Sequence, residues 1–174
     1  RIEKEYDRIG NHGILRGFVW GDEAGCWQQA CCLFDTLPMI YAANDEPNWV
    51  HEFLNILLEK KLQFIEESIN GSKFDIIETG GGALSSTVIS PKMFQEFCLS
   101  YDRRIHNELH RVGHISTYHT CGGMNGILDL IIDTNTDASE TFSPKGVGGN
   151  IEGPEAYNAL HGKVCMIGGM DQFN

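Results

Sequence analysis

Positively charged side chains are scarce in this chain. Its 174 residues contain 13 Lys and Arg against 24 Asp and Glu, which gives a formal net charge of −11 and a pI near 4.9. Nucleic acids and anionic lipid surfaces are bound through clustered Lys and Arg side chains. We therefore expect neither nucleic acid nor membrane among the partners of this protein.

Long apolar runs are absent as well. No stretch approaches the length of about 20 apolar residues that a membrane-spanning helix needs, and the opening residues 1–5 do not resemble a signal peptide. The hydrophobic content of 41% is nevertheless sufficient for a buried core. These features predict a folded cytoplasmic protein.

The chain has no initial Met, and residues 168–174 follow directly on a stretch that is typical of a buried strand. We therefore expect residues 1–174 to form a single domain that is an internal piece of a longer protein. Without a secretion signal, the cysteines are expected to be reduced thiols, most of them in apolar surroundings. They are Cys26, Cys31, Cys32, Cys98, Cys121 and Cys165.

The sequence alternates between short strands and helices. Strands are expected near residues 17, 76, 117, 139 and 166, and helical stretches separate them. This order predicts parallel strands joined by right-handed crossovers, either in an open doubly wound sheet or in a (β/α)8 barrel. The G-x-G-x-x-G fingerprint of the open sheet is missing, because Ala83 and Leu84 follow Gly80-Gly81-Gly82. The α/β fold is therefore expected to be a partial TIM barrel with about five of the eight βα units.

Three helices carry specific expectations. An apolar helix over 27–41 is expected to be interrupted at Pro38, and a long amphipathic helix is expected over 47–70. A further helix begins at Ser90-Pro91 and is stopped by Gly113, and histidines at intervals of four lie on and after it, namely His106, His110 and His114. Such spacing would suit a surface metal site, but a solvated helix face is the preferred interpretation.

Polar residues collect at or just beyond the expected carboxyl ends of the strands, which is where barrel enzymes build their sites. These residues are Asp22, Glu78, His119, Cys121, Glu140 and Asp171. Residues two apart on a strand point the same way, so His119 and Cys121 can face one metal ion. A tetrahedral zinc ion needs three or four protein ligands. The pair is therefore half of a zinc site, although a buried histidine beside a core thiol would have the same spacing.

Glu140 is the nearest candidate to extend this pair, because adjacent strands lie about 4.8 Å apart. It is expected to act as an oxygen ligand or a general base, with a salt-bridged carboxylate as the alternative. Cys165 begins the next strand and is expected to pack in the core.

A glycine run, Gly80-Gly81-Gly82, follows the second expected strand. Its backbone N–H groups offer an anion site, but no Lys or Arg follows to support phosphate binding. We expect it to be a loop that lets a substrate approach the backbone. Glu78, Tyr118 and Gly122 complete the expected substrate-binding set.

Four segments occur in the order found in the uroporphyrinogen decarboxylase superfamily, which the chain resembles most closely over residues 74–174. They are Ile89–Phe97, Tyr101–Ile105, Tyr118–Gly123 and Gly162–Asp171. The resemblance implies a (β/α)8 barrel and one of two chemistries. One branch decarboxylates uroporphyrinogen without a cofactor. The other contains zinc-dependent methyltransferases that move a methyl group between a corrinoid protein and a thiol.

The segment His119-Thr120-Cys121-Gly122 is similar to the H-x-C-Gly pattern of the methyltransferase branch, whereas the decarboxylases typically have an F-x-K-G-like segment there. The resemblance implies that His119, Cys121 and Glu140 bind Zn²⁺, with a further Cys ligand beyond Asn174. It also implies a methyl-corrinoid carried by a partner protein and a small-molecule methyl acceptor or donor. Gly168-Gly169-Met170-Asp171 departs from the G-N-x-D-P run of the decarboxylases, and only the Asp is shared.

Two other readings remain open. A decarboxylase acting on a porphyrinogen would use Asp171 as the carboxylate that faces the pyrrole N–H groups. A non-catalytic binding or assembly module would pair with the rest of the barrel or with another copy of the chain, because five strands cannot close an eight-stranded barrel.

Overall fold

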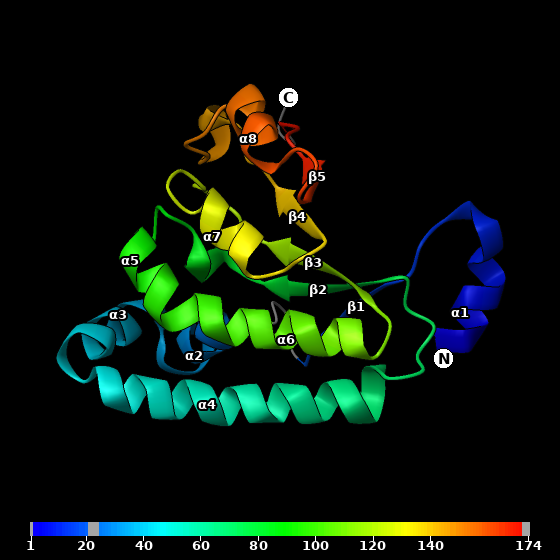
Figure 1. The fold of residues 1–174 in the computed structure, drawn as a ribbon, viewed down its shortest axis with the longest axis horizontal. Coiled ribbons are helices and arrows are strands. Elements are labelled where there is room, and N and C mark those ends of the chain that lie inside the picture. Colours follow the sequence, from blue (N-terminus) through cyan, green and yellow to red (C-terminus); the bar gives the residue numbers. More distant parts are fainter. Residues whose placement is uncertain (1, 21–24, 172–174) are drawn as a thin grey trace.

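A computed structural model describes residues 2–20 and 25–171 of the protein. Its centre is a parallel five-stranded sheet in which the strands lie side by side in chain order, β1-β2-β3-β4-β5 (Figure 1). The strands are β1 (Arg16–Phe18), β2 (Ile76–Gly80), β3 (Ile115–His119), β4 (Ala138–Thr141) and β5 (Cys165–Gly168). All five expected strands are therefore confirmed. Asp22 lies outside the described residues.

Helices connect the strands and cover one face of the sheet. They are α2 (Cys26–Phe34), α3 (Thr36–Asp45), α4 (Pro47–Phe64) with a π-helical turn η2 (Ile65–Ile69), α5 (Pro91–Phe94) with a π-helical turn η4 (Gln95–Leu99), α6 (Ser100–Arg111), α7 (Leu128–Asp133) and α8 (Gly153–Leu160). Short 3₁₀ turns complete the connections at η1 (Gly10–His12), η3 (Gly82–Leu84) and η5 (Lys145–Val147). Parallel neighbours in chain order are the arrangement of consecutive barrel strands. The fold is α/β and forms part of a TIM barrel.

The long amphipathic helix is confirmed as α4, which begins at Pro47 and continues into η2. Its buried residues recur at helical spacing and include Val50, Leu54, Leu57 and Leu58. The helix that begins at Ser90-Pro91 is confirmed too, and the Ser90 hydroxyl caps it by accepting a hydrogen bond from the Met93 N–H at 3.2 Å.

The helix expected over 27–41 is interrupted at a different residue from the one predicted. The break lies at Asp35, whose φ of 72° ends α2, and its carboxylate accepts a hydrogen bond from the Thr36 N–H at 2.7 Å. Pro38 lies in the first turn of α3, where a missing N–H leaves no helical bond unmade. The polar side chain that starts the second helix therefore sets the break, and proline does not.

The three histidines at intervals of four do not form a solvated face; His106 and His110 lie on α6, and His114 follows that helix. His106 is fully buried, with Nε2 2.7 Å from the Thr79 hydroxyl and Nδ1 2.8 Å from the Thr134 carbonyl oxygen. His114 is also buried and bonds the Ile69 carbonyl oxygen at 2.9 Å. Partners on neighbouring elements satisfy both rings, which sequence spacing does not show. Only His110 is partly exposed, and it pairs with Asp137 at 2.7 Å.

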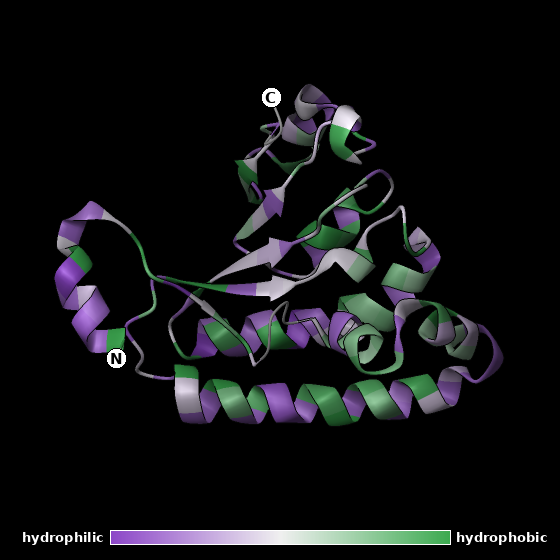
Figure 2. Ribbon diagram, turned by 180° about the vertical axis from the view of Figure 1, so that it is seen from behind, coloured by the Kyte–Doolittle hydropathy of each residue, from purple (hydrophilic) through white to green (hydrophobic). Residues whose placement is uncertain are grey.

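The other face of the sheet, which we call the inner face, corresponds to the interior of a barrel. Within the described residues it is not covered by a helix, as the view from behind shows (Figure 2). Large apolar side chains on it are accordingly exposed: Phe18 to 43%, Ile115 to 54% and Ile167 to 42%. Cys165 is exposed on the same face, so the expectation of core packing is wrong for this residue.

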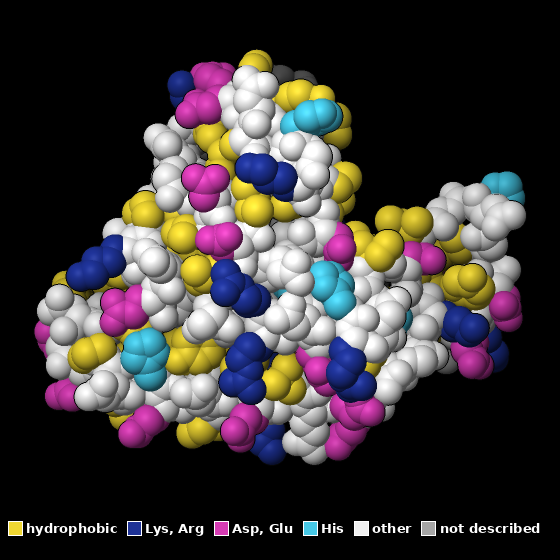
Figure 3. Space-filling model, in the orientation of Figure 1, with side chains coloured by type: hydrophobic (Ala, Val, Ile, Leu, Met, Phe, Trp, Pro, Cys, Tyr) yellow, Lys and Arg dark blue, Asp and Glu magenta, His cyan; other side chains and the backbone are white. Residues whose placement is uncertain are grey.

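Two further features lie at the surface. Helix α1 (Ile2–Ile9), which the sequence did not predict, stands apart from the sheet and buries none of its residues (Figure 1). Acidic and basic side chains are interspersed over the helical face, without a large basic patch there (Figure 3). In the part of the chain that the structure describes, no helix is both long and apolar enough to cross a membrane.

Candidate functional site

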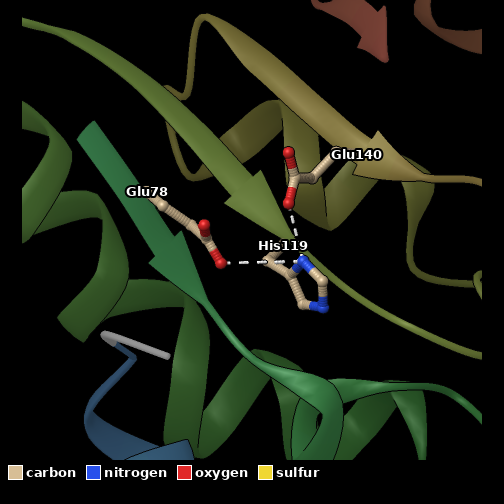
Figure 4. Close-up of side chains that lie close together, drawn as sticks. All are labelled: Glu78, His119 and Glu140. Atoms are coloured by element: carbon tan, nitrogen blue, oxygen red, sulfur yellow. Dashed lines mark hydrogen bonds and ion pairs between the residues drawn. The ribbon is translucent and has the colours of Figure 1, made fainter. Parts of the chain in front are cut away.

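The register of three neighbouring strands builds the candidate site on the inner face. Gly80 of β2 is level with His119 of β3, and His119 is level with Glu140 of β4. Paired residues of parallel strands point to the same side of the sheet, and so do residues two apart. Glu78, two residues before Gly80, therefore faces the same space as His119 and Glu140 (Figure 4).

The three side chains approach one another closely. The His119 Nδ1 lies 2.6 Å from Glu140 Oε1 and 3.7 Å from Glu78 Oε1. One donor atom from each residue lies within 4.8 Å of the others, and this is the one metal-compatible group of three found among residues 2–20 and 25–171. The predicted proximity of His119 and Glu140 is thus confirmed, and Glu78 joins them from β2.

Arg16 is a member of the site that the sequence analysis missed. Its Nη1 donates to Glu140 Oε2 at 2.9 Å and its Nη2 to Glu140 Oε1 at 2.6 Å, and Nη2 also pairs with Glu78. The side chains of Glu78 and Glu140 are only 5% and 8% exposed, so their charges need a partner. The sequence feature that could have pointed to Arg16 was its place as a cationic residue at the start of the first strand in an acidic chain.

The ionised side chains of the site stabilise one another's charged forms. Burial opposes ionisation of Glu140, but hydrogen bonds from His119 and Arg16 outweigh it and lower the pKa of the Glu140 carboxyl. Hydrogen bonds to the Cys121 sulfur and to Glu140 raise the pKa of His119 to about 9. The site therefore favours a protonated, cationic His119 beside the carboxylates of Glu78 and Glu140.

Cys121 follows the end of β3 and is exposed. Its sulfur contacts the His119 imidazole, as the spacing of two predicted, but it lies outside the group formed with Glu78 and Glu140. Gly82 makes room for this sulfur, because a Cβ at position 82 would lie only 2.8 Å from the Cys121 Sγ. The absence of a side chain at Gly82 thus helps to place the thiol.

The first two glycines of the run pack against the protein itself. Gly80 has a φ of 87°, and a Cβ there would lie 2.4 Å from the His119 carbonyl oxygen. Gly81 donates its N–H to that same oxygen at 2.8 Å, and a Cβ at Gly81 would meet the Gln28 side chain at 2.4 Å. These glycines let the loop after β2 cross directly beside the end of β3. A substrate contact at Gly80, Gly81 or Gly82 stays a prediction.

A small hydrogen-bond network fastens the loop after β3. The Ser85 hydroxyl accepts the Gly123 N–H at 2.8 Å, and the Gly123 carbonyl accepts the Ser86 N–H at 2.9 Å. Gly122 has a φ of 88°, and a Cβ there would lie 2.8 Å from the Ser85 Oγ. Gly122 is therefore needed for this loop contact, which holds the backbone next to Cys121 in place.

Two residues from the sequence analysis lie elsewhere. Tyr118 points to the helical side of the sheet, is fully buried and donates its hydroxyl to Asp102 at 2.5 Å, so the structure does not bring it to the site. Asp171 follows β5 and is partly exposed. It is not in the group of Glu78, His119 and Glu140.

Comparisons with known proteins agree with this architecture. A family model described as uroporphyrinogen decarboxylase (URO-D) matches residues 17–173. A solved structure of a methyltransferase from Methanosarcina mazei superposes with a TM-score of 0.79 at 16% sequence identity, over 96% of this chain and 46% of that chain. No curated protein is significantly similar in sequence. The present chain thus spans less than half the length of that methyltransferase. Since the family model covers nearly all of the described residues, the chain belongs to the uroporphyrinogen decarboxylase family.

Proposed function

We propose that the protein containing this chain is a zinc-dependent methyltransferase that moves a methyl group between a corrinoid carried by a partner protein and a thiol. The observation that carries the proposal is the placement of His119 and Cys121, two residues apart, at the carboxyl end of β3. Active sites of barrel enzymes occupy that end of the strands. The methyltransferase from Methanosarcina mazei, similar in fold, supports the same assignment.

The donor set fits zinc. Imidazole nitrogen, thiolate sulfur and carboxylate oxygen are its protein ligands. His119 and Cys121 supply the first two, and the Glu140 carboxylate lies 2.6 Å from the His119 Nδ1. A bound zinc ion would hold the thiol substrate as its thiolate and so supply a nucleophile at neutral pH. The remaining positions would be filled by further protein ligands, such as an additional Cys, and by the substrate.

The transfer itself is a displacement at carbon. A methyl-corrinoid would supply the methyl group as an electrophile, and the carbon–cobalt electron pair would stay on cobalt as the thiolate sulfur took the methyl carbon. The contribution of this chain would be to position the thiol substrate through the zinc ligands Cys121 and His119.

Metal analysis of the full-length protein tests the proposal. We expect stoichiometric zinc in the wild type and its loss in Cys121→Ser. Cys165→Ser is the matched control, because Cys165 is also an exposed thiol on the inner face but lies at the opposite end of its strand. Methyl transfer from methylcobalamin to a simple thiol should fall with the zinc content. Full activity in metal-free protein would overturn the assignment.

Decarboxylation of a porphyrinogen is the second candidate, and the match to the uroporphyrinogen decarboxylase model supports it. In this reading Asp171, just beyond β5, faces the pyrrole N–H groups. Incubation of the full-length protein with uroporphyrinogen distinguishes the two reactions. Release of carbon dioxide that persists in Cys121→Ser and is lost in Asp171→Asn would favour the decarboxylase.

A further inference from the structure

The His119 imidazole offers two different places for a metal ion, one at each ring nitrogen. At Nδ1 the neighbours are the carboxylates of Glu78 and Glu140, which form an oxygen-rich group. The ring presents Nε2 away from both carboxylates (Figure 4). The Cys121 sulfur contacts the same ring. An ion can use one nitrogen or the other, and the two choices assign different roles to Glu140.

The place beside Nδ1 is already held by a cation of the protein. Arg16 engages both oxygens of Glu140, at 2.6 and 2.9 Å, and pairs with Glu78 as well. A two-point contact between a guanidinium and a carboxylate is among the strongest polar contacts in proteins. A metal ion at Nδ1 would have to displace this contact and then lie beside the positive charge of Arg16.

The contact between His119 and Glu140 also sets the ring nitrogens. An ionised carboxylate has no proton to donate, so the 2.6 Å contact requires that Nδ1 carries hydrogen and donates it to Glu140 Oε1. When the ring gives up its second proton to a metal, the nitrogen with a free lone pair is Nε2. Metal-binding histidines commonly donate their second N–H to a carboxylate in this way, which fixes the orientation of the ring.

We propose that Arg16 and Glu140 are positioning residues that present Nε2 of His119, together with Cys121, to the metal. Arg16 fixes the Glu140 carboxylate, and Glu140 holds the imidazole through Nδ1. Glu140 is therefore not itself a metal ligand. This inference rests on the proposed function in that it takes zinc as the metal.

Zinc affinity of the full-length protein, measured by competition with a chromophoric chelator, tests the role of Glu140. In Glu140→Gln the amide oxygen of the new side chain still accepts the Nδ1–H, so this variant should bind zinc within about fivefold of the wild type. Glu140→Ala removes the acceptor and should weaken binding about 10- to 100-fold, the usual effect of losing such a partner. Equal, large losses in both variants would overturn the proposal, because a neutral amide replaces a carboxylate as hydrogen-bond acceptor but does not supply the charge of a carboxylate ligand.

Arg16→Lys tests the contact between Arg16 and Glu140 without changing the charge. Lysine cannot hold both carboxylate oxygens at once, so zinc binding should weaken about tenfold in this variant. In the Glu140→Ala background the same change should have no further effect, because Arg16 acts through Glu140. An equal effect in both backgrounds would contradict the proposed chain of contacts.

The outcomes separate this inference from the proposed function. A wild-type protein that binds no zinc contradicts the function itself. Zinc that is bound by the wild type and lost in Cys121→Ser, but is equally weakened in Glu140→Gln and Glu140→Ala, leaves the function in place and overturns the positioning role alone.

Discussion

Arg16 and Glu140 lie 124 residues apart in the sequence and form a two-point ion pair across the inner face of the sheet. Two strands, β2 and β3, separate the strands that carry them. Flat neighbouring strands would place β1 and β4 about 14 Å apart. The contact therefore shows that the sheet is curved, so that side chains on its concave face converge as they do inside a barrel.

The first prediction concerns the room for the Cys121 sulfur. Gly82→Ala places a methyl group 2.8 Å from the present position of the Cys121 Sγ, so the sulfur must move away from the His119 ring. We expect zinc affinity to fall about tenfold, as for other disturbances around a ligand, while the fold persists. Competition with a chelator measures the affinity, and circular dichroism checks the fold.

Gly153→Ala is the matched control for this variant. Gly153 begins α8, and a Cβ there would meet no atom within 4 Å. The control should bind zinc like the wild type. If Gly82→Ala also did so, the glycine would not be positioning the thiol.

A second prediction separates two glycines that share a left-handed backbone. At Gly80 a Cβ would lie 2.4 Å from the His119 carbonyl oxygen, a backbone atom that cannot turn away, whereas at Gly71 the space is open. Gly71→Ala should cost only the backbone strain, about 1 kcal/mol. Gly80→Ala should lower the free energy of unfolding by more than about 3 kcal/mol. Urea unfolding of both variants measures the difference, and equal costs would show that the loop after β2 can shift.

Periodicity and turn residues were sufficient to predict the sheet. The strands near residues 17, 76, 117, 139 and 166 are present, and the crossover order is that of a barrel. The helix break was misplaced because the sequence analysis relied on the ring of Pro38. Asp35 sets it instead, by accepting the first free N–H of the second helix. A capping side chain and a proline can each determine where a helix breaks, and only the backbone conformation shows which of the two does so here.

The candidate site was predictable only where sequence spacing determines direction. His119 and Cys121 are two apart, so their contact followed from the pleat of one strand. Glu140 followed from the neighbouring strand. Arg16 did not follow, because its contact with Glu140 depends on the curvature of the whole sheet. His106 was misjudged for a similar reason, since its partners come from two other elements.

A third prediction concerns acid stability through His106. Burial lowers the pKa of this histidine from 6.5 to about 4, so the folded protein keeps it neutral. Its contribution is fully present above pH 6.5 and is lost as the pH falls through 4. The difference in pKa corresponds to about 3 kcal/mol. His106→Gln should therefore gain about that much relative to the wild type between pH 7 and pH 4, as measured by urea unfolding. A constant difference between the two proteins would show that His106 titrates normally in the fold.

A fourth prediction concerns Asp102, whose dependence on pH has the opposite sign. Burial raises the pKa of its carboxyl from 3.8 to about 6, although the Tyr118 hydroxyl and the nearby Lys61 favour the charged form. The stabilising contribution of the protonated form is complete below pH 3.8 and is lost as the pH rises through 6. Asp102→Asn cannot ionise, so its stability relative to the wild type should improve by about 3 kcal/mol from pH 4 to pH 7. This loss and the gain from His106 fall in the same pH range and have opposite signs. Measured relative to the wild type in urea at several pH values, the unfolding free energies of the two variants should therefore slope in opposite directions; parallel slopes would contradict the two assignments.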